Sequence, residues 1–531
     1  MPVFLTKNAD SQIKYDRKLD ISSTDMAEDE ASLKLNTSAL LETAFNEIYG
    51  TWKKIALSLQ KQPGAQLAHM PTMSTYASDF GIMLAWQRII ETLIDEPEIT
   101  LVQCCDPWLF RSLACLPNIQ TSEPPSLLRK SLPLWVRGYL ARVKLVARLT
   151  LAKLKTRQMP RLTQKGGPWI LVYGHPDSNA QGGDAYFGDL LKQLPNLRRA
   201  MHTDCSASLA LNLATDKKTI SLHGWGSFLS LLQIPWQKWR PAMSLIDQKY
   251  RWLVKRAAAI EGSGGSAAMT TWQQTCHQSW LQDVQPKTVC WPWENHPWER
   301  DFVRHSRGLN VRTLGYQHTV VGRHMFNQGA DANADGLQSI PDKILLNGPC
   351  YHDDLASRSI PTNRMEILGS HRIGQGQLPT YETSGVVFLA LSNNPSFARQ
   401  MMDATLPFAS RDLQFIVKAH PLNPYPIEES DYFTSTRDTL DALPPIRALI
   451  YCTGTTGLQG LLAGIPTLRF IPKDGVALDI LPESMQVTSV SEADIGAALK
   501  DLPEPYHLNV EALFPPPNLK KWHSTLEPTK P

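Results

Sequence analysis

The sequence lacks the patterns that span a membrane, direct secretion or form a disulfide framework. No run of about 18 apolar residues occurs in its 531 residues, so we expect no membrane-spanning helix. The eight cysteines are scattered without a CxxC pair, which favours buried, reduced thiols. The first residues lack a basic segment followed by an apolar one, so we expect no signal peptide and a cytoplasmic protein.

Length and composition indicate a folded protein with more than one domain. A single hydrophobic core stops growing near ~250–300 residues, so a chain of 531 residues predicts two large domains with some additional helix. The chain is 42% hydrophobic and contains 15 Trp, which supplies the apolar area for such cores. The formal net charge is only +3, so the overall charge gives no reason to expect a nucleic-acid partner.

Residues 125–165 contain no acidic side chain. Apolar residues recur in this segment at helical spacing, with basic residues between them. The apolar positions are Leu140, Val143, Val146, Ala147, Leu151 and Leu154. The basic positions are Arg129, Lys130, Arg137, Arg142, Lys144, Arg148, Lys153, Lys155, Arg157, Arg161 and Lys165. Such a basic amphipathic helix is typical of docking on the anionic inner membrane surface, but a core-facing helix with a solvated basic back fits the same pattern, and both interpretations stay open.

Strands alternate with helices along most of the chain, which predicts an α/β protein with parallel sheets covered on both faces. The predicted strands are 99–105, 169–173, 219–223, 288–293, 311–317, 343–347, 365–368, 386–391, 413–417, 448–452 and 467–471. The predicted parts of the chain are a helical N-terminal extension over 1–75, a Rossmann-like acceptor domain over 76–335 with 125–165 as an insertion, a Rossmann-like nucleotide-sugar domain over 340–505 and a proline-rich tail over 506–531.

Ligands bind beyond the carboxyl ends of the strands in an open parallel sheet, so residues that follow a strand are candidates for a site. In the second half, strand 413–417 is followed by Lys418, His420 and Pro421. A histidine followed by proline is held rigidly, which suits it to hydrogen-bond or protonate a departing phosphate. We therefore expect this strand end to lie at the mouth of a cleft.

The next strand, 448–452, is followed by a turn that contains Thr453, Thr455 and Thr456 and opens a helix. Hydroxyl groups and free backbone N–H groups at the start of a helix form an anion site. The turn is not a Walker loop, because the GxxxxGK[ST] spacing is missing. A threonine N-cap with glycines in a tight turn is the alternative interpretation.

The strand-end histidine-proline pair, the hydroxyl-rich turn and the phrase LLAGIPT together resemble GT-B glycosyltransferases of bacterial surface carbohydrate synthesis. Sialyltransferases, polysialyltransferases, Kdo transferases and the glycerophosphotransferases of teichoic acid assembly share this arrangement. The resemblance covers residues 385–475 and implies two Rossmann-like domains facing each other across a cleft. It also implies a site for the phosphate and nucleotide of a cytidine-linked donor. The residues of that site would be Lys418, His420, Thr453, Thr455, Thr456 and Gln459.

Gln459 departs from the GT-B pattern, because many of these enzymes place a glutamate there to bind the nucleotide ribose. Glutamine can still accept and donate hydrogen bonds. A DxD motif that would hold a metal–nucleotide complex is missing, and the pair Asp353 and Asp354 falls early in a predicted helix. Because His420 and the helix terminus can neutralise the leaving phosphate, we expect a metal-independent enzyme without a resident cofactor.

Glycosyl transfer also needs a base to deprotonate the acceptor hydroxyl. Glu294 follows strand 288–293, and its tryptophan-rich surroundings are expected to exclude water and raise its pKa. The second candidate for the base is Asp184 in the loop QGGDAYFGD, where Gly183 is a candidate for the acceptor site or the cleft. Each carboxylate has an alternative role at the N-terminus of a helix. Glu294 would stabilise the helix dipole, and Asp184 would cap a helix over 185–194.

Gln317 and His318 leave strand 311–317 in the phrase LGYQHTVVGRH. A position just beyond a strand end lets them reach the interdomain cleft, where His318 can assist acid–base chemistry or contact a ligand. A buried histidine with satisfied hydrogen bonds is the plainer alternative. The phrases ENHPWER and GYQHTVV also resemble uncharacterised surface carbohydrate synthesis proteins of the same fold.

These observations favour a glycosyltransferase that moves an acidic sugar, a sialic-acid-like nonulosonate or Kdo, from a CMP-sugar to a surface polysaccharide or glycolipid. Two other enzymes fit the same fold, a CDP-glycerol glycerophosphotransferase and a nucleotide-sugar epimerase. A protein without activity that acts as a GT-B scaffold in capsule assembly is the alternative from another class. Replacing His420 distinguishes the scaffold from the enzymes, because only the enzymes need this histidine.

Overall fold

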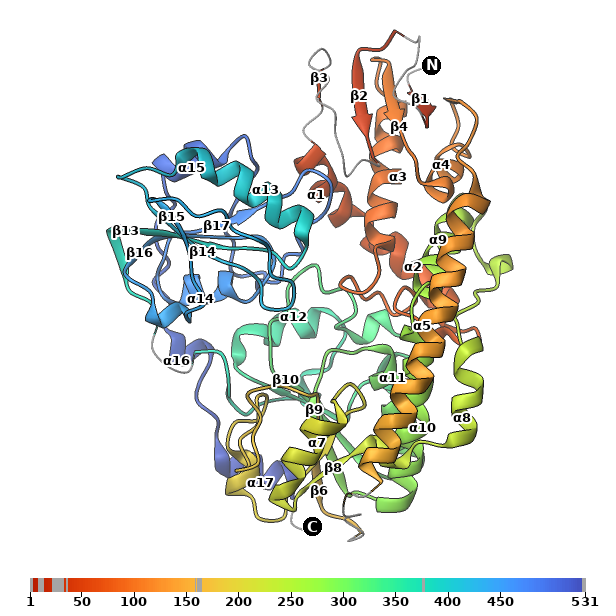
Figure 1. The fold of residues 1–531 in the computed structure, drawn as a ribbon, viewed down its shortest axis with the longest axis vertical. Helices are drawn as coiled ribbons and strands as arrows, with labels where there is room; N and C mark the ends of the chain where they lie inside the picture. The colour runs from red at the N-terminus through yellow and green to blue at the C-terminus, as the bar shows by residue number, and fades with distance from the viewer. Residues whose placement is uncertain are drawn as a thin grey trace.

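The chain forms parallel sheets that carry helices on their faces (Figure 1). The computed structural model describes residues 3–7, 14–21, 33–34, 37–157, 159, 165–374 and 378–527. Within these residues there are three sheets, of five, seven and six strands, and every pair of neighbouring strands is parallel. The predicted α/β class with parallel sheets is confirmed.

The seven-stranded sheet has the order β12-β11-β10-β9-β6-β7-β8. Its strands are β6 (Pro168–Val172), β7 (Arg198–Met201), β8 (Thr219–Ser221), β9 (Thr288–Pro292), β10 (Arg312–Gln317), β11 (Lys343–Leu346) and β12 (Met365–Ile367). Side chains alternate between the faces of a strand, so Trp169 and Leu171 of β6 pack on one side and Ile170 and Val172 on the other. The helices of this domain are α6 (Leu190–Gln193), α7 (Ala207–Leu213), α8 (Phe228–Gln233), α10 (Ser266–Val284), α11 (Pro297–Gly308) and α12 (His352–Ser357), whereas α9 (Arg251–Gly262) packs on the core of the N-terminal region.

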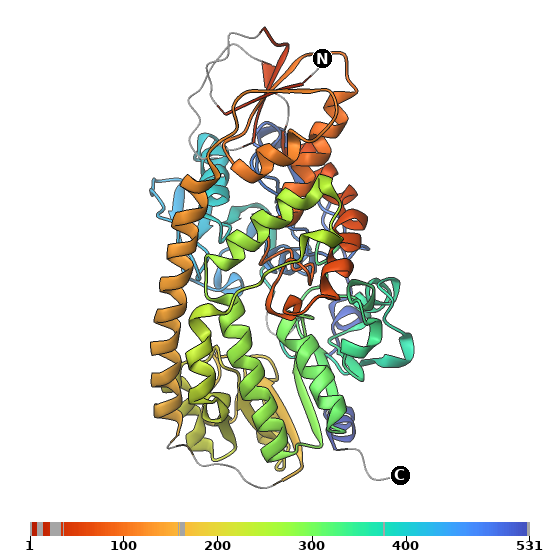
Figure 2. The same ribbon diagram turned by 90° about the vertical axis from the view of Figure 1, so that its right-hand side faces the viewer.

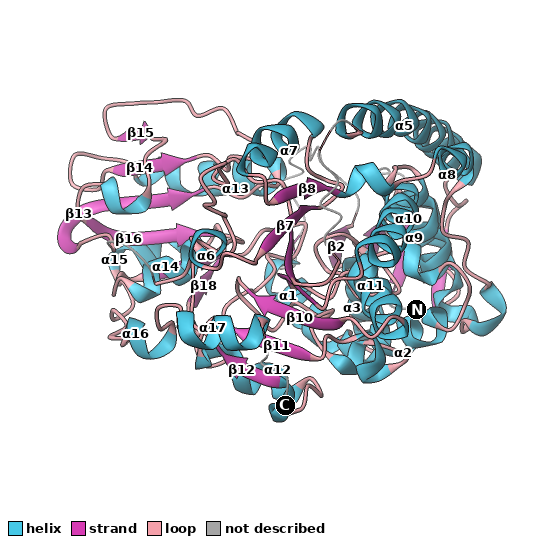
Figure 3. Cartoon of the chain, turned by 90° about the horizontal axis from the view of Figure 1, so that it is seen from below, coloured by secondary structure: helices cyan, strands magenta, loops and turns pink. Residues whose placement is uncertain are grey.

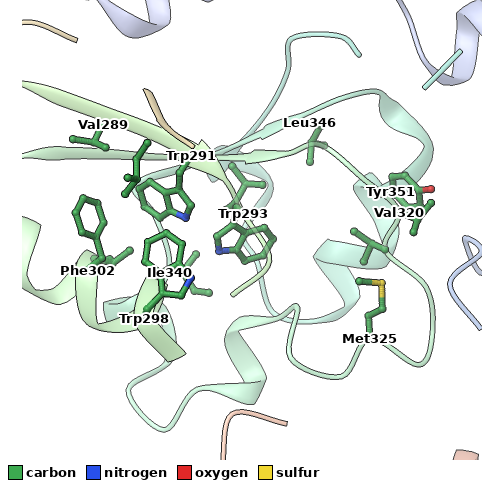
Figure 4. Packing of buried hydrophobic residues seen from close by; sticks show 14 of the residues in the cluster. Val289, Trp291, Trp293, Trp298, Phe302, Val320, Met325, Ile340, Leu346 and Tyr351 are labelled. Carbon is green, nitrogen blue, oxygen red and sulfur yellow. The ribbon is translucent and has the colours of Figure 1, made fainter. Parts of the chain in front are cut away.

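Aromatic side chains fill the space between this sheet and α11 (Figure 4). Trp291 and Trp293 are fully buried, and the rings of Trp291 and Phe302 meet edge to face with centroids 5.3 Å apart. The indole N–H of Trp291 donates to Glu299 at 2.9 Å, which ties β9 to α11. Removing one such aromatic ring from a core costs about 3–5 kcal/mol. The residues that follow β9 therefore stand on a rigid base.

The six-stranded sheet has the order β15-β14-β13-β16-β17-β18 and forms the second Rossmann-like domain. Its strands are β13 (Tyr381–Ala390), β14 (Phe415–Lys418), β15 (Phe433–Ser435), β16 (Ile446–Tyr451), β17 (Thr467–Phe470) and β18 (Thr488–Val490). Its helices are α13 (Pro395–Thr405), α14 (Thr456–Leu462) and α15 (Ile495–Lys500). Residues of α13 and α15 pack on one face of the sheet and residues of α14 on the other.

The second domain begins later than the sequence predicted. Strands 343–347 and 365–368 were assigned to it, but β11 and β12 continue the sheet of the first domain. Leu314 of β10 pairs in register with Lys343 of β11. The segment between these strands is a crossover in which His324, Gln328 and Ala332 are completely buried.

The N-terminal region is also different from the prediction. Instead of a helical extension over 1–75, a separate five-stranded sheet has the order β3-β2-β4-β1-β5. Its strands are β1 (Val3–Thr6), β2 (Arg17–Asp20), β3 (Leu33–Lys34), β4 (Thr100–Gln103) and β5 (Ile119–Thr121), with helices α1 (Thr37–Glu47), α2 (Tyr49–Gln60), α3 (Phe80–Ile94) and α4 (Pro107–Leu113). The predicted strand 99–105 therefore joins this sheet and not the acceptor domain. Parts of 1–75 lie outside the described residues.

The predicted proline-rich tail is a structured return to the first domain. Helix α16 (Val510–Leu513) is followed by α17 (Leu519–Leu526), which lies against the seven-stranded sheet (Figure 1). Trp522 of α17 is fully buried, with its ring centroid 5.2 Å from Tyr316 and 5.9 Å from Phe187. One aromatic anchor thus fastens the end of the chain to the first domain.

The basic segment forms one helix, α5 (Leu127–Thr156), within the predicted 125–165. Ser126 caps it by accepting the backbone N–H of Arg129. The helix runs along the outside of the molecule from the five-stranded sheet to the seven-stranded one (Figure 2). Residues 158 and 160–164 of the segment lie outside the described part. No helix in the described ranges has the length and hydropathy needed to cross a membrane.

Candidate active site

A cavity of about 520 Å³ lies between the two Rossmann-like domains. Its second-domain wall contains every residue of that domain that the sequence singled out. These are Lys418, His420, Thr453, Thr455, Thr456 and Gln459. His318 and Arg372 line it from the first domain. Two Rossmann-like domains facing each other across a cavity are the arrangement expected from the sequence. The fold is of the GT-B class.

His420 sits in a turn just beyond β14. Its Nδ1 accepts the backbone N–H of Leu422 at 3.3 Å, so in the neutral ring the proton is on Nε2. Partial burial lowers the pKa of His420, which favours this neutral form. Asn423 fixes the turn, since its side chain donates to the carbonyl of Asn393 at 3.0 Å and its backbone N–H to the carbonyl of His420 at 3.1 Å. His420 therefore presents one hydrogen-bond donor from a fixed ring.

The hydroxyl-rich turn leads from β16 into α14. Gly454 has φ +148°, and α14 starts at Thr456. The alternative interpretation of this turn, a threonine N-cap, is wrong, because the Thr455 side chain at the cap position makes no capping hydrogen bond. A Cβ on Gly457 would lie 2.4 Å from the Tyr451 ring, so only glycine lets the helix start so close to the strand. The threonines are left to line the cavity.

Arg372 is a site residue that the sequence did not reveal. It is exposed at the cavity edge, and its guanidinium lies over the Tyr186 ring, 5.5 Å from the centroid. Lys418 is a second cation of the cavity, with Nζ donating to the carbonyl of Asp438 at 2.6 Å. Asp441 is the carboxylate among the lining residues. Arg372 lies in the loop after β12, where no motif in the sequence singles it out.

A second cavity, of about 460 Å³, lies in the first domain and shares His318 with the first. Glu294 lines it, with Oε2 2.6 Å from His296 Nε2 and Oε1 3.7 Å from His318 Nε2. Its remaining lining includes His69, Tyr173, Tyr186, His202, Asp204 and Trp298. His318 therefore stands where two adjoining cavities meet, as a ligand-contacting residue would.

The pKa of Glu294 was expected to rise, and this prediction is wrong. Burial does raise it, but the hydrogen bond and charge of His296 outweigh burial and bring the pKa of Glu294 to about 2. In the same pair, the carboxylate outweighs burial and raises the pKa of His296. Burial lowers the pKa of His318 to about 4. The site thus holds an ionised Glu294 between His296, whose protonated form the carboxylate favours, and a neutral His318.

Asp184 does not line either cavity, so their geometry gives no support to a catalytic role for it. Its side chain has no exposed surface and lies 3.5 Å from Arg199, which also pairs with Asp216 at 2.9 Å. Asp184 accepts the backbone N–H groups of Tyr186 and Phe187 in a turn. The predicted helix over 185–194 is reduced to α6, whose cap position is Asp189, so the alternative role of Asp184 as a helix cap is wrong. Burial raises the pKa of Asp184. This residue shapes the loop.

Two predicted cleft residues are likewise structural. The Gly183 carbonyl accepts from Arg199 at 3.2 Å, and a Cβ on this glycine would lie 2.5 Å from Asn179. Gln317 is buried and donates to the carbonyl of Thr319. Gln317 and its neighbour His318 point differently because side chains alternate at the end of a strand.

That the enzyme works without a metal ion stays a prediction. In the described part of the chain, no group of three or more His, Cys, Asp or Glu side chains is arranged to hold a metal ion. Asp353 and Asp354 lie in the first turn of α12, and the exposed Asp353 pairs with His352 at 2.9 Å.

Comparisons with known proteins add only distant likenesses. No family model matches the chain, and no curated protein matches its sequence. The calicheamicin glycosyltransferase CalG4 is 13% identical, with a TM-score of 0.37 over 63% of this chain and 90% of that one. UGT89C1 of Arabidopsis thaliana is 12% identical, with a TM-score of 0.34 over 64% and 91%. MnaA of S. aureus, solved with UDP, is 11% identical, with a TM-score of 0.40 over 68% and 99%. These likenesses assign no reaction to the chain.

Proposed function

We propose that the protein is a glycosyltransferase that binds a nucleotide sugar in the interdomain cavity. The observation that carries this proposal is the gathering of Lys418, His420 and the threonine turn, from two separate strand ends, on one wall of that cavity. Their donors and positive charge suit a phosphate, which carries several acceptor oxygens. Arg372 adds positive charge from the opposite domain.

The leaving phosphate is stabilised by hydrogen bonds in this proposal. His420 donates through Nε2, and Thr455 and Thr456 donate through their hydroxyl groups. These donors are already oriented before the sugar bond breaks, so little reorganisation is needed as negative charge develops. The helix α14 has only seven residues, so the side chains and not its dipole carry the argument. No divalent ion is needed for this step, which addition of EDTA to the assay tests.

The acceptor binds in the second cavity, and His318 is the base. The 3.7 Å between His318 Nε2 and Glu294 Oε1 is too long for a hydrogen bond, so the ring nitrogen is free to accept the acceptor's proton. The neutral form of His318 is the form a base requires. The Glu294 carboxylate stabilises the imidazolium that forms, and His296 holds the carboxylate in place.

The donor is a CMP-linked acidic sugar, sialic-acid-like or Kdo, and the acceptor is a surface polysaccharide or glycolipid at the inner membrane surface. The resemblance of residues 385–475 to transferases of this kind supports the donor, and the carboxylate of such a sugar suits Arg372. A CDP-glycerol glycerophosphotransferase would use the same phosphate site. An epimerase needs no acceptor, so this alternative assigns no ligand to the second cavity.

Calorimetric titration with CMP, CDP, UDP and GDP tests the proposal, with His420→Ala beside the unaltered protein. CMP binding that weakens in the variant supports the donor site, because a lost hydrogen bond to a charged group costs about 1.5–3 kcal/mol, or roughly 10- to 150-fold in affinity. Preference for UDP would redirect the proposal to a hexose transferase or an epimerase. Absence of nucleotide binding would favour the scaffold alternative.

A further inference from the structure

Helix α5 is apolar on two opposite sides. The residues of one side are buried against the rest of the protein. They are Gly138, Arg142, Leu145, Leu149, Ala152 and Thr156. A second row repeats every three or four residues and is exposed; its members are Leu128, Leu132, Val136, Leu140, Val143, Ala147, Leu151 and Leu154. At 3.6 residues per turn the two rows lie on roughly opposite sides of the helix. Leu128, Leu140 and Leu151 are 70%, 60% and 58% exposed, so neither earlier interpretation of 125–165 alone describes the helix.

Basic residues flank the exposed row. Arg137, Lys144, Arg148 and Lys155 are exposed one position after a member of that row, which places them beside it. The sequence contains no Asp or Glu from residue 124 to residue 176. No carboxylate on α5 neutralises these basic residues, so they attract a negatively charged surface.

The apolar surface continues onto α8 and the short helix η4 (Ile234–Trp236). Leu229, Leu232 and Trp236 are 75%, 73% and 64% exposed. Tyr139 of α5 joins the two parts, with its ring 5.5 Å from that of Trp236 and stacked on Trp135 at 6.0 Å. Residues 217–246 also contain no Asp or Glu. We call the exposed row of α5 with Leu229, Leu232 and Trp236 the α5–α8 face.

Buried contacts hold this face in shape. The Arg142 guanidinium donates to the carbonyls of Pro235 and Gly262, each at 2.8 Å, and so connects α5 to η4 and α9. In Figure 3, α5 and α8 lie together at the outer edge of the molecule, on the side away from β13, β14 and β15. The face is thus preformed and points outward.

We propose that the α5–α8 face binds an anionic lipid bilayer, with α5 lying in the plane of the interface. An apolar row about 39 Å long, at 1.5 Å per residue from Leu128 to Leu154, flanked by cations and by Trp and Tyr, matches the layered chemistry of a membrane surface. A second copy of the chain fits less well, because two such faces would bring like charges together.

The proposal deepens the proposed function, and it rests on that function only in the choice of acceptor. A membrane-held enzyme would meet a lipid-linked acceptor within its own plane. Vesicle binding requires neither donor nor acceptor, so it succeeds or fails separately from glycosyl transfer.

Co-sedimentation of the full chain with vesicles tests the face. The probes are vesicles of phosphatidylcholine alone and of phosphatidylcholine with an equal part of phosphatidylglycerol. We expect binding to the mixed vesicles at least about tenfold tighter than to the neutral ones, and weaker as salt is added. The triple variant Leu132→Ser, Leu140→Ser, Leu151→Ser is expected to lose at least about tenfold in affinity, because it removes the apolar anchors.

The matched control is Leu309→Ser, Leu406→Ser, Leu519→Ser, at leucines that are 43%, 42% and 43% exposed away from the face. It should bind the mixed vesicles as the unaltered protein does. A second variant, Lys144→Gln with Arg148→Gln and Lys155→Gln, should lose the preference for anionic lipid. Failure of the unaltered protein to bind mixed vesicles would overturn the proposal, as would equal loss in the control. Dimerisation through the face, seen by sedimentation velocity without vesicle binding, would overturn it in favour of a second copy.

Discussion

Replacing Glu294 with glutamine removes the charge that lies between His296 and His318. The carboxylate is only 29% exposed and lies 2.6 Å from His296, so the pair is largely shielded from solvent. A fall in the pKa of Glu294 from its ordinary range to about 2 corresponds to about 3 kcal/mol of stabilisation. We therefore expect Glu294→Gln to lower the free energy of unfolding by about 3 kcal/mol at the pH where the pair is fully charged.

The pH dependence of this loss distinguishes an ion pair from simple packing. The contribution of Glu294, whose pKa is lowered, is present above the ordinary carboxyl pKa and disappears as pH falls toward 2. The contribution of His296, whose pKa is raised, is complete below the ordinary histidine pKa and disappears as pH rises through the folded value. The variant should thus be most destabilised between about pH 4.5 and 6.5.

Denaturant unfolding followed by tryptophan fluorescence at pH 5.5, 7 and 8.5 measures the effect. The loss should be larger at pH 5.5 than at pH 8.5, because the pairing disappears as pH rises through the raised pKa of His296. Asp353→Asn is the control, because Asp353 pairs with His352 while fully exposed to solvent and should change stability far less than Glu294→Gln does. A loss for Glu294→Gln that is constant or increases with pH would refute the ion-pair reasoning.

Three further predictions concern the site and the residues that hold the fold around it. His318→Gln should lower the rate of transfer by about 10²–10⁴-fold while calorimetry shows unchanged CMP affinity, and an equal loss in both would contradict its role as base. Asp184→Ala should destabilise the fold by about 3–5 kcal/mol, because it leaves Arg199 buried with half of its pairing; a stable variant with slow transfer would return Asp184 to the catalytic set. Trp522→Ala should cost about 3–5 kcal/mol in thermal unfolding, and deleting the C-terminal residues without such a loss would show that the anchor is dispensable.

The donor-side residues could be predicted from the sequence because they depend on a simple rule. Both β14 and β16 are parallel neighbours of β13, so their carboxyl ends emerge at the same edge of one sheet. Any residue directly after either strand must lie near that edge. Lys418, His420 and the threonine turn satisfy this rule without knowledge of any other part of the chain.

The acceptor-side residues could not be assigned in the same way. Asp184 and Glu294 both follow apolar strands in loops rich in turn residues. Nothing in the sequence distinguishes a carboxylate that faces Arg199 from one that faces a cavity. The pKa of Glu294 depended on His296, two residues away, whose ring orientation is set by the turn into α11. Arg372 reaches the cavity from a loop with no pattern of its own.

Local patterns in the sequence were enough to predict the α/β class, the strand-end donor residues and a long basic helix, because alternation, strand ends and the spacing of charges are local properties. Which sheet each strand joins became visible only in the folded chain. There, β4 belongs to the N-terminal sheet, β11 and β12 to the first Rossmann-like domain, and the C-terminal helix α17 to that same domain. The physical reason is that a hydrophobic pattern specifies which face of a segment is buried, whereas its partner is chosen by packing between segments far apart in the chain.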